Sequence, residues 1–146
     1  MGQISDFMTT DHTHCDHLFA EAENAVTDND WETGQTRFES FQSATLHHFA
    51  REENVLFPAF EAKTGIAHGP TVIMRSEHMD MREAMQGMQL ALARHDAESF
   101  LGLAETLLML MRQHNMKEEQ ILYPMADHAL REVAGEMVNR MESMPV

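Results

Sequence analysis

Apolar residues recur along most of the chain at intervals of three and four positions, the spacing of one face of an α-helix. Period-two alternation is nearly absent, and no Asn-Gly or Asp-Gly pair joins two apolar runs, so strands are not expected. The pattern predicts four long helices and a shorter amphipathic one, over residues 10–28, 31–56, 70–94, 97–122 and 126–142. Long helices joined by short links are typical of an all-α, antiparallel up-down-up-down four-helix bundle, here with an added C-terminal helix.

Local signals set the expected ends of these helices. Asp28-Asn29-Asp30 should end the first helix. Pro58 and Pro124 should end the second and the fourth, because proline lacks an amide proton and clashes with the preceding turn. Residues 59–69 are then predicted to form a last turn and a loop. Pro70 should open the third helix, since proline suits a first helical turn.

Composition narrows the class of protein. A chain of 146 residues is large enough for one hydrophobic core but too short for two, so a single domain over 1–146 is expected. The formal charge of −14 disfavours nucleic acid and anionic membrane surfaces as partners. The lone Cys15 cannot form an internal disulfide, and neither a signal peptide nor a run of ~20 apolar residues is present. We therefore expect a soluble cytoplasmic protein.

One phrase of the sequence occurs twice. HFAREENVLFP, residues 48–58, aligns with HNMKEEQILYP, residues 114–124, at an offset of 66 positions. The same offset places SEHMD, residues 76–80, on TDHTH, residues 10–14. The chain therefore consists of two similar helix pairs, which cover about 10–60 and 76–126. A bundle would relate these pairs by a pseudo-twofold axis.

The repeated phrase carries a histidine and a glutamate four positions apart, so both side chains share one helix face. The offset also aligns one histidine from each remaining helix. A carboxylate on a buried face is costly unless it is paired or bound to a cation. Four imidazoles and two carboxylates in symmetric pairs indicate a dinuclear site with bridging glutamates, suited to Fe, Mn, Co or Zn. The candidate ligands are His12, His48, Glu52, His78, His114 and Glu118.

Two residues of the first helix leave alternatives open. His14 could replace His12 as the ligand, although only His12 obeys the repeat. Asp16 lies one turn after His12, where it could orient an imidazole or supply a labile ligand.

Residues that follow the candidate carboxylates are expected to play lesser parts. Glu53 and Glu119 should be solvated or paired with cations, with hydrogen bonds to ligand imidazoles as the alternative. Tyr123, the counterpart of Phe57, is expected to pack in the core. In the C-terminal helix an apolar stripe could either form a homodimer interface or cap the bundle; it comprises Val133, Met137, Val138 and Met141.

These motifs, in this order, resemble the hemerythrin-like (HHE cation-binding) domain family over residues 10–125. The pieces that carry the resemblance are His12, HFARE (48–52), His78 within EHMDMR, and HNMKE (114–118), with the LFP and LYP tails. The resemblance implies an antiparallel four-helix bundle around two non-haem iron ions joined by an oxo or hydroxo bridge. Zinc or manganese could substitute for iron in such a site.

One departure bears on function. Classical oxygen-carrying hemerythrins, to which the family is related, have a second histidine one turn after the third-helix ligand, where this chain has Arg82. The loss of that donor leaves an open position and argues against classical O2 carriage. We expect a protein that binds, senses or reduces O2, NO or peroxide, or that handles iron under such stress. An iron or zinc buffer without turnover is the alternative, so enzymatic activity stays open.

Overall fold

The computed structural model describes residues 2–146, and this part of the chain contains helices but no strand. The long helices are α1 (Gln3–Thr27), α2 (Trp31–Arg51), α4 (Pro70–Ala93) and α5 (Ala97–Lys117). The short ones are α3 (Phe57–Thr64), α6 (Tyr123–Ala129) and α7 (Ala134–Glu142). Two π-helical turns, η1 (Glu52–Leu56) and η2 (Glu118–Leu122), join α2 to α3 and α5 to α6. The all-α prediction is confirmed.

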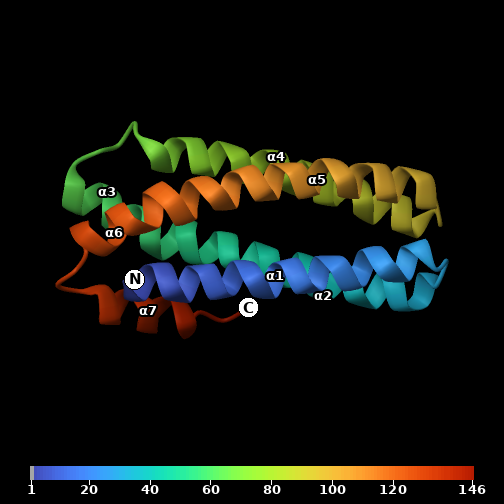
Figure 1. Ribbon diagram of the computed structural model, residues 1–146, viewed down its shortest axis with the longest axis horizontal. Helices are drawn as coiled ribbons and strands as arrows, with labels where there is room; N and C mark the ends of the chain where they lie inside the picture. The colour runs from blue at the N-terminus through green and yellow to red at the C-terminus, as the bar shows by residue number, and fades with distance from the viewer. Residues whose placement is uncertain (1) are drawn as a thin grey trace.

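The long helices form two antiparallel pairs, α1 with α2 and α4 with α5, packed side by side (Figure 1). Both tight turns lie at one end of the bundle, and α3, α6 and α7 lie at the other. Asp30 and Asp96 cap α2 and α5, because their side chains accept hydrogen bonds from the amides of Thr33 and Ser99. The predicted antiparallel bundle with a C-terminal helix is therefore confirmed.

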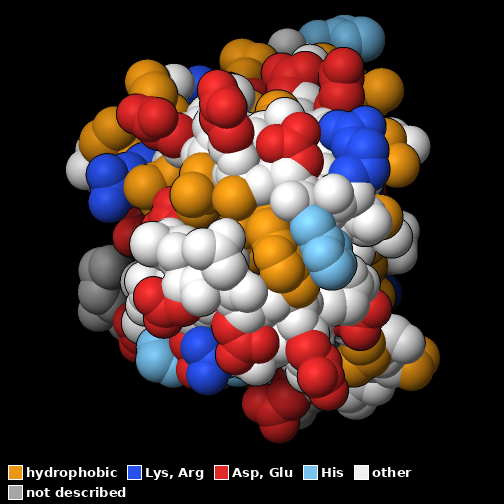
Figure 2. All heavy atoms as spheres, turned by 90° about the vertical axis from the view of Figure 1, so that its right-hand side faces the viewer, with side chains coloured by type: hydrophobic (Ala, Val, Ile, Leu, Met, Phe, Trp, Pro, Cys, Tyr) orange, Lys and Arg blue, Asp and Glu red, His pale blue; other side chains and the backbone are white. Residues whose placement is uncertain are grey.

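The surface at the turn end of the bundle reflects the acidic composition. Asp and Glu side chains lie above and below the middle of this face and cover more of it than Lys and Arg side chains do (Figure 2). None of the helices in residues 2–146 combines the length and the apolar character needed to cross a bilayer.

The helix ends predicted at the two prolines are wrong. Residues 59–64 continue the second helix as α3, which ends only at Gly65 with a left-handed φ of 73°. In η1 the amide of Phe57 bonds to the carbonyl of Glu52, five residues back. This wider turn accommodates Pro58, which has no amide proton and would clash with a regular α-helical turn. The same geometry recurs in η2 before the second proline.

The predicted starts of α2, α4 and α5 at residues 31, 70 and 97 are confirmed, but the first and the last helix differ from the prediction. α1 begins at Gln3 rather than at residue 10. Asp127 of α6 accounts for this extension, because it accepts hydrogen bonds from the amides of Ile4 and Ser5 and from the Ser5 hydroxyl. The C-terminal segment predicted as one helix is divided into α6 and α7.

Two apolar clusters fill the bundle, one on each side of a polar layer. The turn-end cluster contains mainly aromatic and methionine side chains, including Phe19, Phe38, Phe41, Met85 and Phe100. The cap-end cluster lies under α3, α6 and α7 and includes Ile4, Met8, Leu56, Phe57 and Phe60. Each fully buried side chain of this size contributes about 1.5–3 kcal/mol. The clusters can therefore offset the cost of burying the polar layer between them.

The C-terminal apolar stripe belongs to the cap-end cluster. Met137 and Met141 are buried, and Val138 packs against them. Three of the four stripe residues therefore cap the bundle, whereas Val133 is exposed. A homodimer through another surface stays a prediction.

Candidate metal centre

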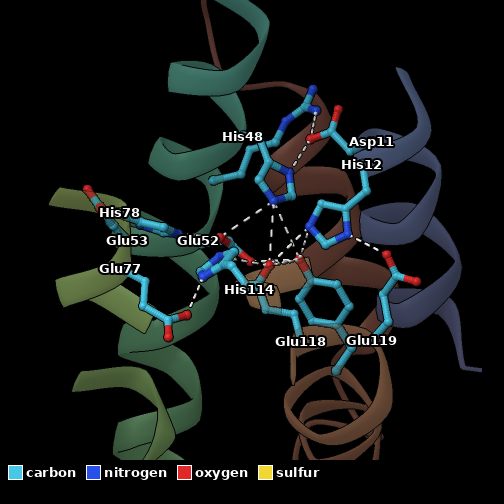
Figure 3. Close-up of polar contacts among 12 residues, drawn as sticks. Asp11, His12, His48, Glu52, Glu53, Glu77, His78, His114, Glu118 and Glu119 are labelled. Carbon is cyan, nitrogen blue, oxygen red and sulfur yellow. Dashed lines mark hydrogen bonds and ion pairs between the residues drawn. The ribbon is translucent and has the colours of Figure 1, made fainter. Parts of the chain in front are cut away.

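All six candidate ligands meet in one buried layer at the middle of the bundle (Figure 3). None of them exposes more than 3% of its surface. They form two groups whose ligand atoms lie within 4.8 Å of one another, and both glutamates belong to both groups. The groups are His12, His48, Glu52 and Glu118, and Glu52, His78, His114 and Glu118. This sharing is consistent with a binuclear metal site.

Each glutamate lies between imidazoles of the two helix pairs. Oε1 of Glu118 lies 3.0 Å from Nε2 of His12 and 3.2 Å from Nε2 of His114. Glu52 has the same relationship with the other two histidines, at 2.9 and 3.5 Å. Every imidazole therefore turns Nε2 toward the centre.

The outer nitrogen, Nδ1, of every imidazole lies within hydrogen-bond distance of a carboxylate. Because a carboxylate can only accept, Nδ1 carries a proton, which leaves Nε2 as the nitrogen that faces the centre and that could bind a metal ion. The pairs are His12 with Glu119 at 2.7 Å, His48 with Asp11 at 2.7 Å, His78 with Glu53 at 2.6 Å and His114 with Glu77 at 2.8 Å. This hydrogen bonding is the usual way in which proteins orient histidines that bind metals.

Two of these four carboxylates were expected mainly to be solvated or ion-paired, and two were given no role. Glu53 and Glu119 both orient imidazoles, as the alternative had it, and Glu53 is in addition paired with a cation, as the main expectation had it. Asp11 and Glu77 each precede a candidate ligand and obey the 66-residue offset. The repeat could have indicated them, but their partners lie on neighbouring helices, which only the fold reveals.

Cations lie behind three of the four orienting carboxylates. Arg51 pairs with Asp11 at 2.9 Å, and Lys117 pairs with Glu77. Although burial raises the pKa of Asp11, its hydrogen bonds to His48 and Arg51 prevail and lower it to about 2. These ion pairs keep the orienting carboxylates charged at neutral pH.

Arg82 completes the third pair and does not reach the centre. Its guanidinium binds both oxygens of Glu53 at 3.0 Å and lies over the ring of Phe49. At the position equivalent to Arg82 the other helix pair has Asp16. In residues 2–146, Glu119 accordingly has no Lys or Arg partner within ion-pair distance. The two halves of the centre thus differ in charge.

His14 and Asp16, the two open alternatives of the first helix, are exposed and belong to neither group of candidate ligands.

The electrostatics of the centre favour extra positive charge. Burial raises the pKa of Glu52, and the adjacent Glu118 raises it further. Burial disfavours the charged form of His114, but the negative charge of Glu118, 3.2 Å from Nε2, outweighs this and raises the pKa of His114 to about 9. The pKa of His48 is raised well above its usual value, since Glu52 overcomes the effect of burial. Protons thus balance the buried carboxylates, a role that metal cations can take over.

Two buried polar atoms of the centre have no hydrogen-bond partner, namely Oε2 of Glu118 and Nε2 of His114. Leaving such groups unpaired costs ~1–3 kcal/mol each. The donors are imidazole nitrogens and carboxylate oxygens, a set that suits first-row transition metals. Cys15 lies outside both groups, and burial raises the pKa of its thiol. The residues therefore fit a pair of metal ions.

Tyr123 packs in the cap-end cluster, as expected, and its hydroxyl also reaches the centre. Its hydroxyl donates to Oε2 of Glu52 at 2.7 Å and lies 2.9 Å from Oε1 of Glu118. In a regular α-helix, residues five apart differ by about 140° around the axis. The π turn η2 bonds residues five apart, and so aligns Tyr123 with Glu118. Sequence reasoning missed this alignment because it ended the helix at Pro124.

Comparison with known proteins identifies one family, and its match covers the helices that carry the candidate ligands. The family model described as the hemerythrin HHE cation binding domain matches residues 3–126. No curated protein and no solved structure matches. The matched range contains all six candidate ligands, and α7 lies beyond it.

Proposed function

The chain belongs to the hemerythrin HHE cation-binding domain family, and on that premise we propose that it is a non-haem di-iron protein that binds and reduces a small oxidant such as O2, NO or peroxide. One observation carries the proposal, namely the convergence of four Nε2 atoms on two shared, buried carboxylates. In this proposal one iron is held by His12 and His48, the other by His78 and His114, and both by Glu52 and Glu118.

Two ferrous ions would supply the two electrons that, with two protons, convert hydrogen peroxide into two water molecules. The chain itself would orient the ligands and exclude water. The Nδ1 hydrogen bonds hold each imidazole in one tautomer, and the charged groups behind them fix the carboxylates. The apolar clusters on both sides shield the centre from solvent.

The burial of the centre supports a small ligand. With no candidate ligand more than 3% exposed, a bulky organic substrate has no direct access to the centre. Diatomic molecules and peroxide are small enough to enter through transient openings in side-chain packing. Arg82 is engaged by Glu53, so it supplies no donor where classical hemerythrins have a histidine.

Metal content and reactivity together test this proposal. Protein purified without oxygen should contain about two irons per chain, and its absorption should change when air, NO or peroxide is admitted. Repeated peroxide additions with a reductant should be consumed catalytically. A zinc-loaded sample provides the redox-inert control. Two tightly bound metals with no response to any oxidant would overturn the redox proposal and leave a metal buffer, whereas protein without bound metal would exclude both.

A further inference from the structure

Tyr123 and Phe57 occupy equivalent positions in the two helix pairs and differ by one hydroxyl group. Both directly follow a π turn, and both are fully buried. The ring of Tyr123 stacks on His12, with centroids 5.6 Å apart, and the ring of Phe57 stacks on His78, at 5.9 Å. The phenolic oxygen thus breaks the pseudo-twofold symmetry beside one pair of histidines.

This oxygen has more polar neighbours than one hydroxyl proton can serve. Besides Glu52 and Glu118, at 2.7 and 2.9 Å, it lies 3.1 Å from Nε2 of His12 and 3.5 Å from Nε2 of His48. Donor atoms that share an ion at ~2.1 Å lie about 3 Å from one another. The distances from the phenolic oxygen to the atoms of the first ligand group are therefore similar to the distances expected between ligands of one ion.

The other half of the centre lacks such an oxygen. Phe57 offers only ring carbon there, and Nε2 of His114 and Oε2 of Glu118 have no hydrogen-bond partner. Among residues 2–146, no hydroxyl therefore lies beside the second group as the hydroxyl of Tyr123 lies beside the first.

We propose that Tyr123 is a seventh protein ligand, which binds as phenolate to the ion held by His12 and His48. The ion held by His78 and His114, which faces Phe57, keeps its free position for the small oxidant. Binding forms a metal–oxygen bond and breaks the phenolic O–H bond, whose proton is released to solvent. This inference rests on the proposed binuclear centre, and it makes the two ions chemically unequal.

The composition of the chain makes the inference easy to test, since Tyr123 is the sole tyrosine among the 146 residues. Any tyrosinate signal must come from it. Titration of metal-free protein with zinc at neutral pH should produce the ultraviolet difference spectrum of one phenolate for every two zinc ions bound. The ferric protein should show a visible charge-transfer band in which resonance Raman detects tyrosinate ring vibrations.

The matched variant is Tyr123→Phe, which copies the residue found at the equivalent position of the other half. It should still bind two metals, with complete loss of the phenolate signals. Two bound metals without any phenolate signal in the unmodified protein would overturn the inference and leave the binuclear centre standing. Failure of the unmodified protein to bind metal would instead overturn the proposed function and this inference with it. If the variant does not fold, the spectra of the unmodified protein still decide the matter.

Discussion

Nδ1 of His114 on α5 lies 2.8 Å from a carboxylate oxygen of Glu77 on α4. Lys117, close to His114 on the same helix, pairs with the other oxygen of Glu77. A single carboxylate thus orients a candidate ligand and is itself held in place by a cation. Glu77 directly precedes His78 in α4. One of these adjacent residues therefore orients His114, and the other is itself a candidate ligand in the same group.

Glu77→Gln should therefore weaken metal binding without removing any candidate ligand. The amide can still contact His114, but it lacks the charge that makes the imidazole a stronger ligand, and it no longer attracts Lys117. We expect zinc affinity, measured by competition with a chelator, to fall roughly 10–100-fold. Glu83→Gln, an exposed carboxylate on the same helix, is the control. Equal affinities in the two variants would contradict the orienting role.

Loss of a shared carboxylate should weaken the binding of both metal ions, whereas loss of one histidine should weaken the binding of only one. Glu118 contacts imidazoles of both groups, so Glu118→Ala should lose both metals. His12→Ala removes a donor from the first group only, and about one metal per chain should remain. Metal content by mass spectrometry distinguishes the two results, with His17→Ala, an exposed histidine of α1, as the control. A full loss in His12→Ala would mean that the ions bind only as a pair.

The six candidate ligands could be found from the sequence because the repeat conserves residue type and spacing together. His48 and Glu52, four apart, point to one face of any α-helix, and the 66-residue offset finds their counterparts. The long helices follow from apolar periodicity in the same way. These predictions needed only regular α-helical geometry.

The contribution of Tyr123 could not be predicted on that basis, because it depends on a departure from α-helical geometry. The π turn η2 directly precedes Tyr123 and Pro124, where the sequence predicted that the helix would end. Pairs such as Asp11 with His48 were out of reach for another reason, since they join side chains of different helices. Such contacts depend on how the helices are rotated against each other, which periodicity does not specify.

The early start of α1 should depend on Asp127. Its carboxylate accepts hydrogen bonds from the Ile4 amide at 2.9 Å and from the Ser5 hydroxyl at 2.5 Å. Asp127→Ala should lower the free energy of unfolding by ~1–2 kcal/mol, as the loss of a helix N-cap does. Urea unfolding measures this change, and Glu132→Ala, at an exposed position, is the control. A change as small as in the control would show that α1 needs no anchor at this end.

The stability of the metal-free protein should fall as the pH rises from about 6.5 through 9. The pKa of His114 is raised from 6.5 to about 9 in the folded chain, so over this range the folded state retains a proton that the unfolded state releases. By linkage, the stabilisation is fully present below pH 6.5 and is lost as the pH passes 9. For His114 alone this corresponds to about 3 kcal/mol, and the raised pKa of His48 acts in the same direction.

Urea unfolding in the presence of a chelator, at several pH values between 6 and 9.5, measures this slope. His114→Gln cannot gain the proton and should give a shallower slope. Saturating zinc should oppose the decline, because ions that displace protons from the centre bind more tightly as the pH rises. Metal-free stability that stays constant or increases between pH 6.5 and 9 would contradict the prediction. In that case the buried carboxylates would be balanced by something other than protons on His48 and His114.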